Sequence, residues 1–291
     1  MVFQLLKEGF SMKIIYKTNK KFKNADAFLF GLKGFSTLEE EITLEELSSF
    51  SDKKIFLAVD KNMFNSDLSL LENILSNVDK YNISGILFYD LSVLSICKRL
   101  GVKTPLIWNQ NYLVTNYKTC NFYEKEGVSG AVISSLITHD EIVNICNKTK
   151  FDIFVYGFGY QMMALSKRRL ISDYFEYIKE SDNKDVHYMI EKDDSYPTIE
   201  SSVGTKMYTK DILNSIKYIN ELKKAGVKYL ILDDFMIDDD IFLKVSEIYE
   251  RAVNSDLGDD ELIAMEQEIK ALLPNVSTMF LDKKTVFKVK R

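Results

Sequence analysis

The stretch AGVKYLILDD, residues 225–234, contains the unit from which the fold can be inferred. It follows Lys223-Lys224 and begins with the turn Ala225-Gly226-Val227. Lysines in a last helical turn and a glycine directly after it are typical of a helix C-terminus. An apolar run, Tyr229–Leu232, comes next, and Asp233-Asp234 ends it. The stretch therefore predicts a helix end, a tight turn, a buried strand and a polar strand end.

Similar units recur along the chain, for example at Leu100-Gly101-Val102 and Glu126-Gly127-Val128. Most of the predicted strands are continuous apolar runs rich in β-branched and aromatic residues, which is typical of parallel strands covered on both faces. Eight such strands are predicted: Lys13–Tyr16, Ala27–Leu32, Lys54–Asp60, Gly85–Asp90, Pro105–Asn109, Gly130–Ser134, Asp152–Tyr156 and Tyr229–Asp233.

Helical patterns lie between most of these strands, at Leu68–Val78, Ser92–Leu100, Thr115–Glu126 and His139–Lys148. Repeated strand–helix alternation predicts an α/β fold with a parallel sheet. Eight strands fit a (β/α)₈ TIM-like barrel whose first helix is very short or absent. An open doubly wound sheet is the alternative, although the first strand lacks the glycine-rich phosphate turn of that fold.

The alternation is interrupted between residues 182 and 210, where HYMIE and YPTIESS resemble two antiparallel strands. We predict an inserted β-hairpin there, before a helix over Asp211–Lys224, and two more helices after Ile241. The chain has three prolines and no low-complexity linker, so a single barrel domain over residues 12–291 is expected. Met12 directly precedes the first strand, which makes residues 1–11 a candidate N-terminal tail.

Composition limits the classes of function. The 291 residues carry a net charge of −5, which gives no overall attraction to nucleic acid or to acidic membranes. The three cysteines form no close pair, as expected of a protein in the reducing cytoplasm. No apolar run approaches the length needed to span a bilayer, so neither a membrane location nor a membrane partner is expected.

Aspartates stand at several predicted strand ends, where barrel enzymes place their chemistry. Asp233 and Asp234 are the candidate catalytic pair, as acid and base. The structural alternative is that strand-end aspartates, such as Asp60 and Asp90, cap the following helices.

The sequence gives little support for a metal site or for a catalytic triad. His139 and His187 have no partner at ligand spacing, so no metal site is predicted. A nucleophile elbow and a Cys–His signature are also missing from the sequence.

The segment VYGFGYQMMALSKRRLISDYF, residues 155–175, begins like a strand and ends like an amphipathic helix. A helix that began before Lys167 would bury this lysine in its apolar stripe, so the helix is expected to start after it. Ser166, Lys167 and Arg168 then belong to a loop above the seventh strand. This basic cluster is either part of a ligand site or a solvated surface.

This segment resembles peptidase family U-32, the collagenase-like proteases, in the short form of low-GC bacteria. Gly157, Gly159, Ser166 and Arg168 match the family's pattern of a strand followed by Ser-x-Arg-Cys. Two further segments carry the resemblance: Gln110 with Thr115-Asn116, and the C-terminal KKTVFKVK.

The chain also departs from the family pattern. Tyr156 stands where many members have His, and Arg169 where they have Cys. Ser134-Ser135 replace the usual Arg-Glu, and Asp233 stands near the family's Glu.

The resemblance implies a cytoplasmic hydrolase or protease with a TIM barrel. Some members instead hydroxylate RNA or quinone precursors with an iron–sulfur cluster held by four cysteines. With three cysteines such a cluster is not expected here, and no other cofactor is predicted. A degenerate binding or accessory subunit, or a protein related to RNA modification that lacks the cluster, is therefore the alternative to a peptidase.

The expected ligand is a peptide or an anionic small molecule, and oligomers with itself or with a family relative are considered. RNA is a weaker candidate because two or three basic side chains contribute little to phosphate binding. The expected substrate-binding residues are Gln110, Asn116, Tyr156, Gly157, Gly159, Ser166 and Arg168.

Overall fold

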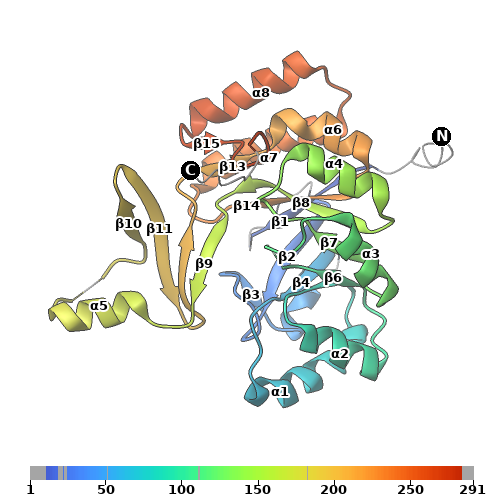
Figure 1. Ribbon diagram of the computed structural model, residues 1–291, viewed down its shortest axis with the longest axis vertical. Helices are drawn as coiled ribbons and strands as arrows, with labels where there is room; N and C mark the ends of the chain where they lie inside the picture. Colours follow the sequence, from blue (N-terminus) through green and yellow to red (C-terminus); the bar gives the residue numbers. More distant parts are fainter. Residues whose placement is uncertain are drawn as a thin grey trace, which may run out of the picture.

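A closed parallel barrel forms the body of the molecule in the computed structural model, which describes residues 11–18, 22, 25–50, 52–110, 112–181 and 183–283. Strand β14 pairs in parallel with both β1 and β8, which closes the circle (Figure 1). The predicted (β/α)₈ barrel is thus confirmed. Its strands are β1 (Lys13–Lys17), β2 (Ala27–Leu32), β4 (Lys54–Val59), β5 (Ile83–Phe88), β6 (Leu106–Trp108), β7 (Gly130–Val132), β8 (Asp152–Gly159) and β14 (Tyr229–Asp233).

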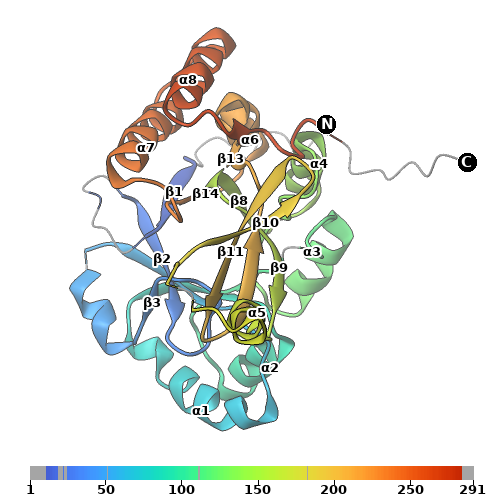
Figure 2. The same ribbon diagram turned by 90° about the vertical axis from the view of Figure 1, so that its left-hand side faces the viewer.

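Helices surround this barrel (Figures 1 and 2). No helix is present among the described residues between β1 and β2, whereas β3 (Glu41–Ile42) and the 3₁₀ helix η1 (Glu45–Phe50) lie between β2 and β4. The outer helices are α1 (Asn65–Leu75), α2 (Leu91–Leu100), α3 (Tyr117–Lys125), α4 (His139–Lys148), α6 (Ile219–Ala225), α7 (Asp239–Asn254) and α8 (Asp259–Leu272), with short 3₁₀ turns η2 (Val78–Lys80) and η3 (Ile216–Tyr218). Within the described chain, no helix is both long and apolar enough to cross a membrane.

Alternation along the strands separates two layers of apolar side chains. Along each strand, every second side chain points into the barrel interior, and the side chains between them pack beneath the helices. The interior is therefore a packed core, and only the strand ends are open to chemistry. Its buried members are Ile15, Ala27, Leu29, Phe56, Ala58, Leu87, Ile107, Val132, Phe154, Tyr229 and Ile231.

An arm, which we define as residues 162–208, projects from the barrel beyond β8 (Figure 1). The predicted hairpin is present as β10 and β11, but it belongs to a larger four-stranded antiparallel sheet in the order β10-β11-β12-β9. The elements of the arm are β9 (Met162–Ser166), α5 (Leu170–Ile178), β10 (His187–Glu191), β11 (Asp194–Ser201) and β12 (Gly204–Tyr208). Strand β9 was missed because its partner, β12, lies far along the chain and nothing local marks the pairing.

The segment expected to form one helix over Asp211–Lys224 is different. It starts as β13 (Ile212–Asn214), which pairs antiparallel with the end of β8 and parallel with β15 (Val276–Ser277). Only its later part is helical, as η3 and α6. The predicted N-terminal tail, except for Ser11, and all but the first residue of the KKTVFKVK motif lie outside the described residues.

Candidate functional site

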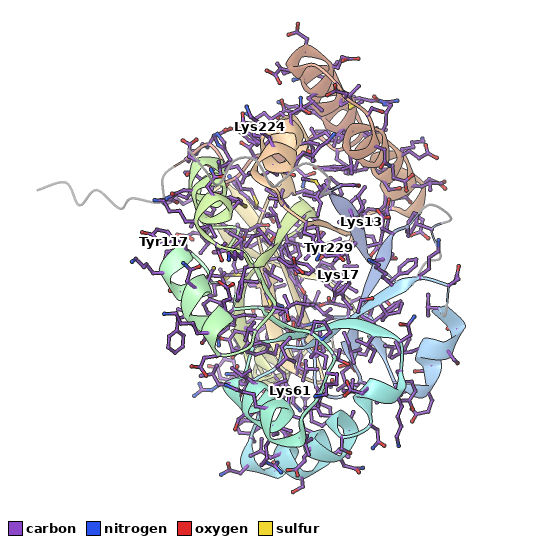
Figure 3. All side chains as sticks on the ribbon, turned by 90° about the vertical axis from the view of Figure 1, so that its right-hand side faces the viewer. Lys13, Lys17, Lys61, Tyr117, Lys224 and Tyr229 are labelled. Carbon is purple, nitrogen blue, oxygen red and sulfur yellow. The ribbon has the colours of Figure 1, made fainter. Side chains whose placement is uncertain are left out.

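A buried ion pair lies at the carboxyl end of the barrel strands. Lys17 ends β1, and its ammonium Nζ lies 2.6 Å from Oδ2 of Asp233, the last residue of β14. The two strands place these residues directly opposite each other. Their side chains are only 8% and 3% exposed, so each charge depends on the other for its neutralisation. Figure 3 shows Lys13 and Lys17 at the two ends of β1, beside the strand that carries Tyr229.

Glu39 connects this ion pair to the arm. Its carboxylate accepts hydrogen bonds of 2.6 Å from both Lys206 Nζ and the Tyr208 hydroxyl, two side chains of β12. Lys17 Nζ lies 3.9 Å from the same carboxylate. Lys206 is 1% exposed and also donates to the Thr37 carbonyl oxygen at 2.7 Å. We call Lys17, Glu39, Lys206 and Asp233 the mouth cluster, which holds the arm over the barrel opening.

Burial and charge act in opposite directions on the mouth cluster. Burial raises the pKa of the Asp233 carboxyl, and the nearby Lys17 ammonium opposes this change. Burial alone would lower the pKa of Lys17, but the carboxylates of Asp233 and Glu39 raise it above its ordinary value. Burial would likewise raise the pKa of Glu39, but Lys17 and Lys206 hold it below its usual range. Lys17 is therefore a fixed cation at neutral pH and a poor nucleophile.

Tyr156 lies in β8 close to Lys17 of the mouth cluster, and its expected role in substrate binding stays a prediction. Its ring packs against the apolar filling of the barrel. Burial raises the pKa of its hydroxyl to about 12, with Lys17 opposing the change. Tyr156 is consequently neutral at physiological pH and can act as a hydrogen-bond donor.

A pocket of about 240 Å³ opens beside the mouth cluster. It presents one ammonium, four carboxylates and an apolar wall, and Phe235 in that wall contacts Tyr208 with ring centroids 4.4 Å apart. Met236 adopts a positive φ of 58°, an unusual backbone conformation that clusters at functional sites. The lining residues are Lys17, Glu39, Glu40, Asp233, Asp234, Phe235, Met236 and Ile237.

The strand-end aspartates have different partners. Asp234, which lines the pocket, accepts a hydrogen bond of 2.6 Å from the Thr18 hydroxyl. Asp90 caps α2 by accepting from the Ser92 amide, which is the structural role predicted as the alternative to chemistry. Asp60 caps no helix, and instead fixes the loop after β2 by accepting from the Ser36 hydroxyl and the Thr37 amide, both at 2.7 Å.

The two glycines of β8 have separate reasons to be glycine. A Cβ on Gly157 would lie 2.5 Å from Leu230 Cγ, so this position serves close packing. Gly159 has φ +121°, and a Cβ there would lie 2.6 Å from the Cβ of Asp233. Gly159 thus leaves room for Asp233 in the mouth cluster.

Gln110 and Asn116 are not among the lining residues of the described pocket. Gln110 accepts from the Trp108 indole at 3.0 Å and donates to the Tyr89 carbonyl oxygen at 2.6 Å. Asn116 is the N-cap of α3 and accepts from the Thr119 amide. Their expected role in substrate binding stays a prediction, and both have structural partners.

The basic cluster lies at the base of the arm. As expected, the helix starts after Lys167, at Leu170, although Ser166 ends β9 and does not lie in a loop. Lys167 joins the arm to the barrel, because its Nζ donates to the Asn62 carbonyl oxygen at 3.3 Å.

Lys167 Nζ also lies 3.7 Å from the centroid of the Phe64 ring. Arg169 pairs weakly with Glu200 at 3.7 Å, and both Arg168 and Arg169 are exposed. The pocket lining contains neither Ser166 nor Arg168, and their role in binding a ligand is likewise still a prediction.

Sequence reasoning missed Lys17, Glu39, Lys206 and Tyr208 as parts of the site. A lysine at the end of an apolar strand could have marked Lys17, since such a charge must find a partner. Glu39 lies in a connection, and Lys206 lies in a strand whose partners were not recognised, so no local signal pointed to either residue.

Comparison with known proteins places the chain in a family. A model described as Peptidase family U32 matches residues 18–288. The chain belongs to this family. The sequence resemblance to U32 proteins is thereby confirmed.

Among relatives of this U32 protein, tRNA hydroxylation protein P2 of Bacillus subtilis strain 168 is 25% identical over 286 residues, which cover 90% of this chain and 93% of that protein. tRNA hydroxylation protein P1 of the same strain is 22% identical over 262 residues, covering 84% and 62%. Collagenase of Porphyromonas gingivalis W83 is 21% identical over 257 residues, covering 79% and 61%. The chain thus matches nearly all of P2 but only about three fifths of P1 and of the collagenase.

The cysteines of this U32 protein do not fit a cluster held by four thiolates. Cys97, Cys120 and Cys146 lie in three different helices, and all are buried. Burial raises the pKa of Cys97 and of Cys120 to about 12, which disfavours the thiolate form that ligates iron. Within the described residues, no group of three or more His, Cys, Asp or Glu is arranged to hold a metal ion.

Proposed function

We propose that this U32 protein acts in tRNA hydroxylation, and that its mouth pocket receives a nucleoside of the RNA. The observation that carries the proposal is the match to tRNA hydroxylation protein P2, which extends over nearly the full length of both chains. The match to the collagenase covers a smaller part of that protein. The share of each relative that the match covers thus favours a role in RNA modification over proteolysis.

The chemistry of the pocket supports a nucleoside as ligand. Its carboxylates accept hydrogen bonds, and a nucleoside offers base N–H groups and ribose hydroxyls as donors. Phe235 in the apolar wall offers a surface on which a base can stack. A phosphate or another anionic group fits the pocket less well than an uncharged base and ribose, because the lining contains four carboxylates and one ammonium that is already paired.

Peptide hydrolysis by Asp233 and Asp234 has weaker support. A general base must be free to take a proton from water, whereas Asp233 lies 2.6 Å from the Lys17 ammonium. Asp234 accepts from Thr18. We therefore assign this chain the binding and positioning of RNA.

Nucleoside analysis of tRNA tests this proposal. The gene is deleted in the native organism, total tRNA is digested, and hydroxylated nucleosides are quantified by mass spectrometry. We expect a several-fold loss that a plasmid copy restores.

Purified protein is assayed in parallel on gelatin and on mixed peptides. An unchanged nucleoside profile would contradict the proposal. Hydrolysis that Asp233→Ala abolishes would establish a peptidase instead.

A further inference from the structure

The outer strand of the arm is an exposed, apolar sheet edge. Strand β10 ends the order β10-β11-β12-β9 and has no strand beyond it among the described residues (Figure 1). Tyr188, Met189 and Ile190 in its centre are 55%, 47% and 74% exposed. Proteins usually protect such edges with charges, proline or a covering segment. At the opposite edge, the Tyr112 hydroxyl donates to the Met163 carbonyl oxygen of β9.

The backbone of β10 presents hydrogen-bonding groups outward. Tyr188 lies opposite Pro197 of β11, and proline has no N–H to donate. Hydrogen-bonded and non-hydrogen-bonded pairs alternate along antiparallel strands. Tyr188 and Ile190 are therefore in non-hydrogen-bonded positions, and their N–H and C=O groups point away from β11, toward any strand that approaches the edge.

The sequence of β10 is complementary to itself when it runs antiparallel about Met189. In that register Tyr188 faces Ile190 of the partner subunit, an aromatic–β-branched pair that stabilises sheets. His187 faces Glu191 of the partner subunit, which places a hydrogen-bond donor against an acceptor. We propose that a second copy of this chain pairs with β10 in this way, so that two arms form one continuous eight-stranded sheet.

Charge favours a protein partner over RNA at this surface. The arm carries nine acidic and seven basic residues, so it has no net attraction for phosphates. The pairing adds about four main-chain hydrogen bonds across the two-fold axis and covers apolar side chains of both copies. It does not depend on the proposed role in tRNA hydroxylation.

A cysteine at the two-fold axis tests the register. In the paired state the two Met189 Cα atoms lie about 4.5 Å apart, as in a non-hydrogen-bonded pair. This separation is within the ~4.4–6.8 Å range of disulfides. We expect Met189→Cys to form a covalent dimer under mild oxidation.

Ile263→Cys, at a side chain 49% exposed on α8, is the matched control and is expected to remain monomeric on a denaturing gel. The native cysteines are buried and do not compete. If the two variants cross-link equally, the proposed register is wrong.

A proline at the edge tests the hydrogen bonds. Ile190→Pro removes an outward N–H that the free arm does not use, so the fold should be retained. Light scattering should show a dimer for the wild-type protein and for Ile190→Val, and at least tenfold weaker association for Ile190→Pro, with unchanged circular dichroism. A monomeric wild-type protein at micromolar concentration, or a dimer that Ile190→Pro leaves intact, would overturn the proposal.

Discussion

At the scale of single residues, the buried ion pair of Lys17 and Asp233 should contribute strongly to the stability of the fold. Removing one partner leaves the other charged and without compensation, which typically costs about 3–5 kcal/mol. We therefore expect Lys17→Met to lower the free energy of unfolding in urea by roughly this amount. The double variant Lys17→Met/Asp233→Leu should recover much of the loss, since it removes both charges. A single variant as stable as the wild-type protein would show that the pair is solvated.

The same variant has a predicted pH dependence. Burial already raises the pKa of Asp233 in the folded protein, and loss of the Lys17 ammonium removes the effect that opposes it. A carboxyl whose pKa is higher in the folded than in the unfolded state favours folding at low pH, and loses this contribution as pH rises through its folded pKa. The stability deficit of Lys17→Met should therefore shrink as the pH is lowered from neutral toward the ordinary pKa of aspartate. Urea titrations that give a constant deficit would contradict this assignment.

A substitution at Gly159 tests how closely the backbone of β8 packs against Asp233 of the mouth cluster. Its φ of +121° opposes any side chain, and so does the distance of only 2.6 Å that would separate an added Cβ from the Cβ of Asp233. Gly159→Ala should therefore lower the midpoint of thermal unfolding more than Gly34→Ala, where φ is +78° but no atom lies within 4 Å of an added Cβ. Equal effects would mean that backbone conformation alone requires glycine here.

At the scale of elements, the contacts of Lys167 indicate that the basic cluster helps to hold the arm on the barrel. Both Lys167 and its neighbour Arg168 are exposed, but Lys167 joins the arm to the barrel through Asn62 and Phe64. We expect Lys167→Ala to increase amide hydrogen exchange in β9 and β12, because arm opening becomes less costly. Arg168→Ala is the control and should leave exchange unchanged. Equal protection in both variants would remove Lys167 from the contacts that hold the arm.

The elements also differ in how far the sequence determines them. The barrel strands were predictable because each is a local apolar run bounded by turns, as in Tyr229–Asp233. The full sheet of the arm was not, because β9 and β12 pair across a long separation and their side chains do not alternate clearly between apolar and polar. A single helix was predicted over Asp211–Lys224, but pairing with the end of β8 imposes the strand β13 on its start.

At the scale of the whole molecule, the site is assembled from distant parts of the chain. Barrel topology brings strand ends together, so Asp233 could be placed at the mouth in advance. Glu39 and Lys206 come from a connection and from the arm, and their meeting depends on how the arm lies over the barrel. The contributions of Glu39 and Lys206 to the site could therefore be recognised only in the structure.

The level of hydroxylated nucleosides in tRNA, measured in a deletion strain complemented with Glu39→Gln, tests whether the mouth cluster serves tRNA hydroxylation. Glutamine keeps the shape of Glu39 but removes the charge that Lys206 and Lys17 face in the mouth cluster. We predict that this variant, at wild-type abundance, restores the nucleoside at least tenfold less well than the wild-type copy. Glu45→Gln, at an exposed position of η1, should restore it fully. Full restoration by Glu39→Gln would contradict the assignment of the mouth cluster to tRNA hydroxylation.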